Sequence, residues 1–147
     1  MRGVSVAALV CLCVLGACQA KETQHVGIAP TEVSLSELAS RIGFELPPHT
    51  ELLGSSKENG IDEAVLAKVV IRVDEWPEFL KHAALSDADF VESKRYLLGN
   101  NNGWWDPERA AVLPTAQTEV AAGRYLNVGV DRSGPGRIVL YLMWHET

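Results

Sequence analysis

The sequence predicts a small α+β domain, in which an antiparallel sheet of three to five strands carries helices mainly on one face. Three observations predict it: a capped amphipathic helix that begins near residue 35, a run of β-branched residues over Val65–Val73, and two strands joined by a turn near the C-terminus. The 147-residue chain has room for one such domain, which we expect over residues 34–147.

The first helix is expected to begin after Ser34. Ser34 and Glu37 have the spacing of a capping box, in which the hydroxyl caps the helix and the carboxylate reaches back. Gly43 is placed to end the helix in a left-handed turn. The residues expected on its buried face are Leu35, Leu38, Ala39 and Ile42.

The next elements are expected in the order strand, strand, helix, helix. A short strand over 51–56 and a polar turn over 57–60 precede the β-branched strand over 65–73. Asp74 is then expected to cap a second helix, because a proline that follows three residues later is tolerated in a first helical turn. Its buried side is predicted at Trp76, Phe79, Leu80 and Ala83. Residues 86–98 resemble a further short helix, with an acidic start.

The second half of the chain is predicted to be mainly strand. After an Asn-rich loop over 100–108, a strand is expected over 115–120, and a hairpin over 125–144 whose turn contains Gly134, Pro135 and Gly136. The last strand is apolar on both faces, which predicts a central position in the sheet.

The N-terminal segment has the pattern of an export signal. Arg2 gives it a positive start, and an apolar run over 4–15 follows. Polar residues from Gln19 onwards come too early for a membrane-spanning helix, which needs about 20 apolar residues. We therefore expect residues 1–17 to be a signal peptide.

Leu15-Gly16-Ala17-Cys18 resembles the lipobox of bacterial lipoproteins at every position. The resemblance implies cleavage before Cys18, a diacylglycerol on its thiol and an acyl chain such as palmitate on the new amino group. Two or three chains anchor a protein stably, whereas one does so only marginally. Gln19 stands where an aspartate would, in that family, retain the protein at the inner membrane. The expected location is therefore the cell envelope, at the outer membrane and facing the periplasm, with residues 18–33 as a flexible tether.

The net charge of the chain limits the classes of binding partner to be expected. The chain has 13 Lys and Arg against 19 Asp and Glu, a formal charge of -6. This balance argues against a nucleic acid partner, which rewards clustered cations, and suits a basic one. Cys11, Cys13 and Cys18 all lie in the leader or at its cleavage point, so we expect no disulfide in the exported domain.

The sequence contains no catalytic signature, and we expect a protein that is not an enzyme and has no cofactor or metal. Nucleophile elbows, phosphate loops and metal-spaced Cys or His are absent from it. His25, His49, His82 and His145 are dispersed. Acidic residues 87, 89 and 92 lack the pattern of a calcium loop and are interpreted as a helix start.

The most suggestive segment for binding is the loop that contains two adjacent tryptophans. One version stacks a sugar on Trp104 or Trp105, with Asn101, Asn102 and Asp106 as hydrogen-bonding groups. Another version uses the same residues to contact a protein. The alternative is that both tryptophans cover parts of the core, since large aromatic residues are mostly buried.

Two C-terminal stretches, 123–127 and 141–147, together with 103–107, look like segments of small bacterial envelope proteins without an assigned activity. This similarity supports the architecture and implies no mechanism. The hypothesis is therefore a lipid-anchored, non-enzymatic binding protein, with an immunity or inhibitor protein for a toxin or hydrolase as one version. The alternatives are a carbohydrate or peptidoglycan-binding module that uses Trp104 and Trp105, or a hydrolase with an unrecognised site.

Overall fold

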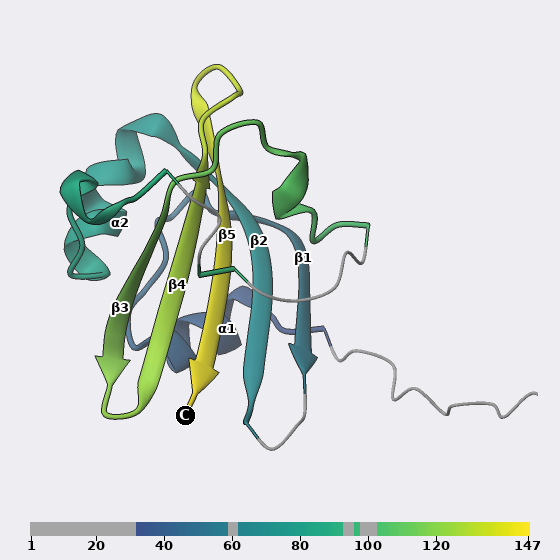
Figure 1. Ribbon diagram of the computed structural model, residues 1–147, viewed down its shortest axis with the longest axis vertical. Helices are drawn as coiled ribbons and strands as arrows, with labels where there is room; N and C mark the ends of the chain where they lie inside the picture. The colour runs from purple at the N-terminus through teal and green to yellow at the C-terminus, as the bar shows by residue number, and fades with distance from the viewer. Residues whose placement is uncertain (1–31, 59–61, 93–95, 98–102) are drawn as a thin grey trace, which may run out of the picture.

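A computed structural model describes residues 32–58, 62–92, 96–97 and 103–147, and its centre is a five-stranded antiparallel sheet (Figure 1). The strands are β1 (Glu51–Glu58), β2 (Ala64–Arg72), β3 (Thr115–Ala121), β4 (Arg124–Asp131) and β5 (Arg137–Glu146). Their order in the sheet is β1-β2-β5-β4-β3. The α+β class is confirmed, and so is the central position of the last strand.

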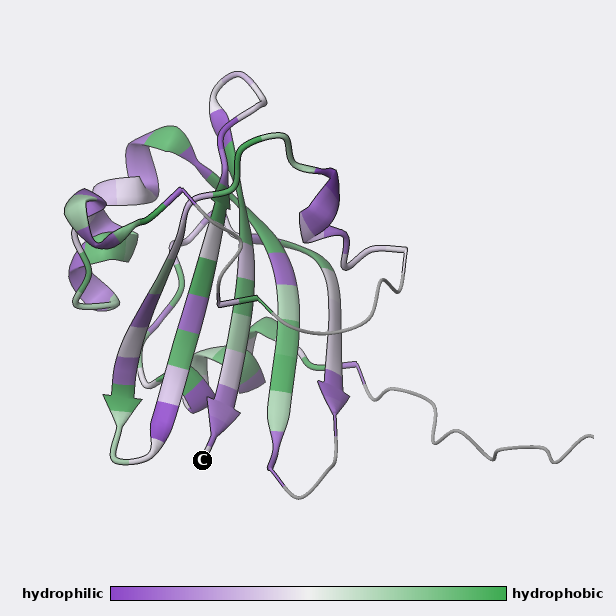
Figure 2. Cartoon of the chain, in the orientation of Figure 1, coloured by the Kyte–Doolittle hydropathy of each residue, from purple (hydrophilic) through white to green (hydrophobic). Residues whose placement is uncertain are grey.

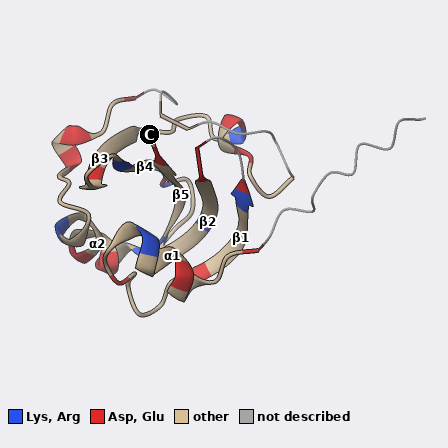
Figure 3. Cartoon of the chain, turned by 90° about the horizontal axis from the view of Figure 1, so that it is seen from below, with Lys and Arg blue, Asp and Glu red and all other residues tan. Residues whose placement is uncertain are grey.

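Both α-helices lie on one face of the sheet, which curves around them (Figure 3). They are α1 (Leu35–Ile42) and α2 (Trp76–His82), and α2 follows directly on a 3-10 turn, η1 (Val73–Glu75). The hydroxyl of Ser34 accepts a hydrogen bond from the Glu37 amide at 3.2 Å, and Gly43 ends α1 with a φ of 79°, as predicted. The Glu37 carboxylate accepts from Arg41 at 3.1 Å.

The inner core fills the space between the helices and the sheet. Alternation along β2, β4 and β5 directs one apolar set of side chains toward the helices, and these strands are hydrophobic along much of their length (Figure 2). Each buried aliphatic or aromatic side chain contributes about 1.5–3 kcal/mol relative to exposure. The central members are Val65, Ala67, Val69, Ile71, Leu126, Val128, Val130, Ile138, Leu140, Leu142 and Trp144, with Leu38, Ile42 and Phe79 from the helices.

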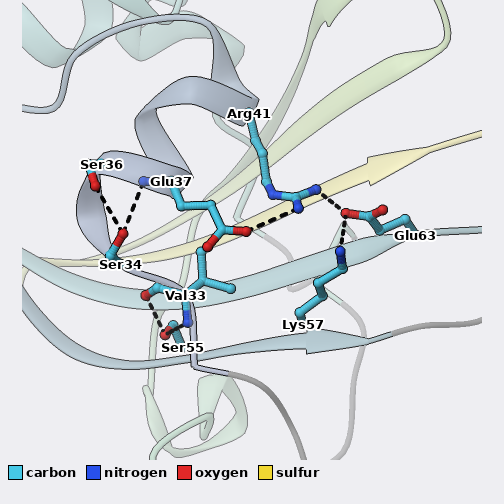
Figure 4. A network of polar contacts seen from close by, with 8 residues as sticks. All are labelled: Val33, Ser34, Ser36, Glu37, Arg41, Ser55, Lys57 and Glu63. Atoms are coloured by element: carbon cyan, nitrogen blue, oxygen red, sulfur yellow. Dashed lines mark hydrogen bonds and ion pairs between the residues drawn. The ribbon is translucent and has the colours of Figure 1, made fainter.

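A charged cluster at the surface connects α1 to β1 and the start of β2 (Figure 4). Arg41 forms ion pairs with Glu37 and Glu63, and Glu63 also accepts from Lys57, with 3.2 Å between nitrogen and oxygen. The Arg41 guanidinium lies 5.2 Å from the ring centroid of Trp144. Partly exposed pairs of this kind contribute at most about 1 kcal/mol each, so the cluster orients α1 more than it stabilises the fold.

The N-terminal end of the described chain is held against β1. The Val33 amide donates to the Ser55 hydroxyl at 2.8 Å, and that hydroxyl donates to the Val33 carbonyl at 2.7 Å (Figure 4). Val33 is buried in the inner core. The prediction that the tether extends to residue 33 is therefore wrong at its end. The signal peptide, Cys18 and the rest of the tether lie outside the described residues.

The prediction of a helix over residues 86–98 is also wrong. The described part of this segment has only the 3-10 turn η2 (Asp87–Asp89), after which Val91 pairs with the start of β3. The Asp89 carboxylate accepts from the Ser86 amide at 2.7 Å and from its hydroxyl at 2.8 Å. Such local bonds compete with helix propagation, and here they close a single turn.

The outer face of the sheet is covered by chain rather than by a helix. Residues 103–114, which we name the covering segment, cross this face and include the 3-10 turn η3 (Pro107–Arg109) (Figure 1). Beneath it, the Trp104 ring lies so close to Gly54 of β1 that a Cβ atom there would be 2.4 Å from Trp104 Cδ2. A side chain at residue 54 would therefore exclude the ring.

We predict that Gly54→Ala lowers the free energy of unfolding by about 1–3 kcal/mol, because the added methyl group must displace the Trp104 ring. Urea unfolding measures the loss, and the tryptophan emission should shift to the red as Trp104 moves outward. Gly134→Ala is the matched control, since a Cβ there meets nothing within 4 Å. Equal stabilities for the two variants would contradict the prediction.

Candidate functional site

A cleft of about 660 Å³ opens on the outer face, between the covering segment and the residues that end β4. It contains both charged and apolar side chains. The charged members are Lys68, Asp106, Arg109, Asp131 and Arg132, and the apolar side chains of the walls include Ala111, Val112 and Pro114. A hollow of similar volume beside α1 has a single charged lining residue, Glu45. The cleft on the outer face is the better candidate, because convergent polar groups in an apolar hollow are typical of binding sites.

The floor of the cleft is a buried group of three polar side chains. Lys68 of β2 and Tyr141 of β5 are cross-strand neighbours, and Asp106 reaches them from the covering segment. Asp106 Oδ1 accepts from Lys68 Nζ at 2.5 Å and from the Tyr141 hydroxyl at 2.9 Å. The side chains of Lys68 and Asp106 are 15% and 10% exposed, so this is a largely buried ion pair. The Lys68 ammonium also lies 5.1 Å from the Tyr141 ring centroid.

These contacts fix the protonation of the floor. Burial alone would raise the pKa of Asp106, but the hydrogen bonds from Lys68 and Tyr141 outweigh it and hold that pKa below its ordinary value. Burial, and then the hydrogen bond to the Asp106 carboxylate, raises the pKa of the Tyr141 phenol above its ordinary value. At neutral pH Asp106 is therefore ionised and Tyr141 is protonated.

Two arginines stand at the rim of the cleft. Arg109 is 71% exposed, and its Nη1 lies 3.7 Å from Asp106 Oδ2, beyond hydrogen-bonding distance. Arg132 lies with its guanidinium 4.7 Å from the Trp76 ring centroid and Nη2 3.3 Å from Asp87 Oδ1. The rim therefore presents the exposed Arg109 guanidinium, whereas the Arg132 guanidinium is turned toward Trp76 of α2 and Asp87.

A second attachment holds the chain that leads into the covering segment. Asn127 of β4 is buried on the outer face, and its Nδ2 donates to the Tyr96 carbonyl at 2.7 Å. The same amide is oriented by Gln117 of β3, whose Nε2 donates to Asn127 Oδ1 at 2.8 Å. Asn127 thus ties a second point of the chain to the outer face of the sheet.

The structure separates the residues that the sequence grouped into a binding loop. Trp105 is 0% exposed and packs edge-on against Tyr141, with 5.4 Å between ring centroids, so for this ring the expected alternative of a core position holds and the stacking version does not. Its neighbours in this outer core are Leu66, Leu113 and Met143. Trp104 is half-buried over Gly54. Asp106, predicted as a hydrogen-bonding group for a ligand, is instead buried in the ion pair with Lys68, while Asn101 and Asn102 lie outside the described residues.

Sequence reasoning missed most of the site. Lys68 carried the one usable signal, because it interrupts an otherwise apolar strand and a lysine is almost never buried unless it is paired. Tyr141 belonged to a strand that is apolar on both faces, so its hydroxyl did not stand out. Arg109 and Arg132 carried no signal that separates them from ordinary surface arginines.

Comparison of the chain with protein-family models, with curated proteins and with solved structures gave no match. The site therefore rests on its own geometry. Among the described residues, no group of three or more His, Cys, Asp or Glu side chains is placed to hold a metal ion. Within the same residues, no helix is long and apolar enough to cross a membrane.

We predict that Asp106→Asn lowers stability by about 3 kcal/mol at pH 7, because it leaves the Lys68 ammonium buried without its counter-ion. The folded pKa of Asp106 is lowered, so its contribution is present above its unfolded pKa near 3.9 and is lost as the pH falls through the folded value. The difference between wild type and variant should therefore stay level from pH 7 to 5 and shrink below pH 4.

Denaturant unfolding at several pH values measures this difference. Asp74→Asn is the control, because Asp74 is 66% exposed and pairs with an exposed Arg72. Its effect should stay below about 1 kcal/mol. A difference for Asp106→Asn that grows as the pH falls would contradict the assignment of the ion pair.

Proposed function

We propose that this protein is a lipid-anchored, non-enzymatic binding protein of the bacterial cell envelope, and that the cleft is its binding site. The lipobox at residues 15–18 supports attachment through Cys18, and Gln19 supports the outer membrane as the location. The observation that carries the binding role is the cleft itself. In it, fixed charges and apolar walls converge in a hollow that exists without a ligand.

The chemistry of the floor favours binding over catalysis. A general base or an activated nucleophile needs a pKa near the working pH. The lowered pKa of Asp106 makes it a weak base, and the raised pKa of Tyr141 makes it a weak acid. The hydrolase alternative would therefore need its reacting groups elsewhere.

For a protein partner, the rim supplies suitable contacts. Arg109 is 71% exposed and Val112 is 62% exposed, and arginine is among the residue types that dominate interface energies. The formal charge of -6 would speed encounter with a basic partner. An immunity or inhibitor protein that holds a toxin or hydrolase is the version we favour. In the carbohydrate-binding alternative, the buried Trp105 cannot stack on a sugar, so the stacking would depend on Trp104 alone.

The anchor is tested by cell fractionation in the native host. The wild-type protein should sediment with the outer membrane, whereas Cys18→Ser should appear in the soluble periplasmic fraction. The lipid makes the difference, because the apolar area of the acyl chains holds the wild type in the bilayer. Sedimentation of both proteins with membranes would contradict lipid attachment at Cys18.

The binding role is tested by affinity capture from envelope extracts with cross-linking and mass spectrometry. The double variant Arg109→Gln/Val112→Ser should retain a partner at least about tenfold less than wild type, which corresponds to about 1.4 kcal/mol. Arg124→Gln is the matched control, because Arg124 is an exposed arginine at the far end of β4. Equal capture by all three proteins, or loss only with Trp104→Ala, would contradict the cleft as the binding site.

A further inference from the structure

We propose that a hollow beside α2 is a second binding site, which takes an arginine side chain of a basic protein partner in place of the chain's own Arg132. This inference deepens the proposed function and rests on it for the kind of partner. The hollow has a volume of about 180 Å³, and we name it the Trp76 hollow. Its lining consists of Trp76, Asp87, Phe90, Glu92, Pro114, Val130 and Arg132.

The floor of the Trp76 hollow is an aromatic ring whose orientation is fixed by packing. Trp76 stacks on Phe79 with 5.6 Å between ring centroids, and Phe90 stands against it at 5.5 Å with an interplanar angle of 56°. The Trp76 Nε1 donates a hydrogen bond to Asp87 Oδ1 at 3.0 Å, which places a carboxylate at the edge of the ring. A tryptophan face beside a carboxylate attracts a cation through the ring quadrupole and through the opposite charge.

Arg132 shows which kind of cation fits this floor. Its guanidinium lies 4.7 Å from the Trp76 ring centroid, while its Nη2 donates to Asp87 Oδ1 at 3.3 Å. A planar guanidinium combines stacking on a ring with a hydrogen bond in its own plane, which a compact ammonium group does not. The structure thus holds a guanidinium of its own at the place where we propose that a partner's guanidinium binds.

The contacts of Arg132 are easily exchanged. The side chains of Arg132 and Asp87 are 49% and 73% exposed, and a pair this exposed to water is weak. The strand β4 and its pairing with β5 both end at Asp131, so Arg132 lies in the turn that follows. Its side chain can therefore leave the ring without breaking the pairing of the sheet.

The charge of the Trp76 hollow favours a cation from outside. Two carboxylates, Asp87 and Glu92, line it together with one guanidinium, so it has an excess of one negative charge. Within the described ranges, Glu92 forms no ion pair and Asp87 Oδ2 accepts no hydrogen bond. An incoming arginine has five N–H donors for these acceptors. The formal charge of -6 on the whole chain has the same sign and attracts a basic partner.

The size of the Trp76 hollow indicates a side chain of a larger partner rather than a free small molecule. Its volume of about 180 Å³ is below the range of roughly 300–1,000 Å³ that is typical of small-molecule sites. Pro114 and Arg132 also line the cleft, so the two sites adjoin. A protein seated on the cleft therefore reaches the Trp76 hollow with a neighbouring side chain.

The experiment uses the full chain in a non-ionic detergent, with N-acetylargininamide as the probe and N-acetylcitrullinamide as its uncharged match. The indole N–H signal of Trp76 is followed by ¹H–¹⁵N NMR. Arg132→Gln should bind the arginine probe about fivefold or more tightly than wild type, because its own side chain no longer occupies the site. Arg124→Gln, which removes an exposed arginine at the far end of β4, should bind like wild type. The citrulline probe should shift the signal in none of the three proteins.

Asp87→Asn, added to Arg132→Gln, should weaken binding of the arginine probe about fivefold or more, because the carboxylate charge is lost while an oxygen remains for the Trp76 indole. A measurement on wild type needs no variant. There the Arg132 Nε–H signal should move toward the position of a solvated arginine as the arginine probe is added.

The inference is overturned by equal or weaker binding of the arginine probe to Arg132→Gln than to wild type, or by a lack of binding to both. Equal binding of the citrulline probe would overturn it too, and so would an Arg132 signal that stays in place while the Trp76 signal moves. The proposed function is decided separately by the envelope capture with Arg109→Gln/Val112→Ser, because neither residue lines the Trp76 hollow.

Discussion

The ion pair between Lys68 and Asp106 is the contact on which the outer half of the molecule depends. It joins the centre of the sheet to a segment that contains little regular structure, and it brings the Tyr141 hydroxyl to the same carboxylate oxygen. A buried pair gains little net stability over apolar residues of similar size, because both charges lose their hydration. Its value here is positional: it fixes where the covering segment crosses the sheet, and so it shapes the floor of the cleft.

Close packing over two glycines of the sheet adds to this electrostatic contact. Gly54 gives the Trp104 ring its place on β1, and Gly129 does the same for Leu97 on β4, where a Cβ atom would lie 2.4 Å from Leu97 Cδ1. Asn127 supplies a polar counterpart by holding the Tyr96 carbonyl. On the outer face, glycines make room for rings and side chains of the covering chain, and polar side chains hold that chain by hydrogen bonds. The inner face instead relies on continuous apolar packing against α1 and α2.

The parts of this fold that the sequence predicted are those with local causes. Ser34 and Gly43 bound α1 through their own backbone geometry, and the β-branched run and the hairpin gave the strands. The helix expected over 86–98 failed because Asp89 closes a local turn with Ser86. The site was beyond local reasoning, because Lys68 and Asp106 are far apart in the chain and meet only through the path of the covering segment. Nothing in the adjacent pair Trp104-Trp105 indicates which ring is buried.

The position of β5 has a consequence for how the chain acquires its structure. β2 pairs with β5 along its whole length, from Ala64 with His145 to Arg72 with Arg137. The hairpins β1–β2 and β3–β4 therefore stay unconnected until β5 is available, and this high contact order slows folding. The sheet closes only once the C-terminal strand has been made, and until then each hairpin lacks the partner that covers its inner edge.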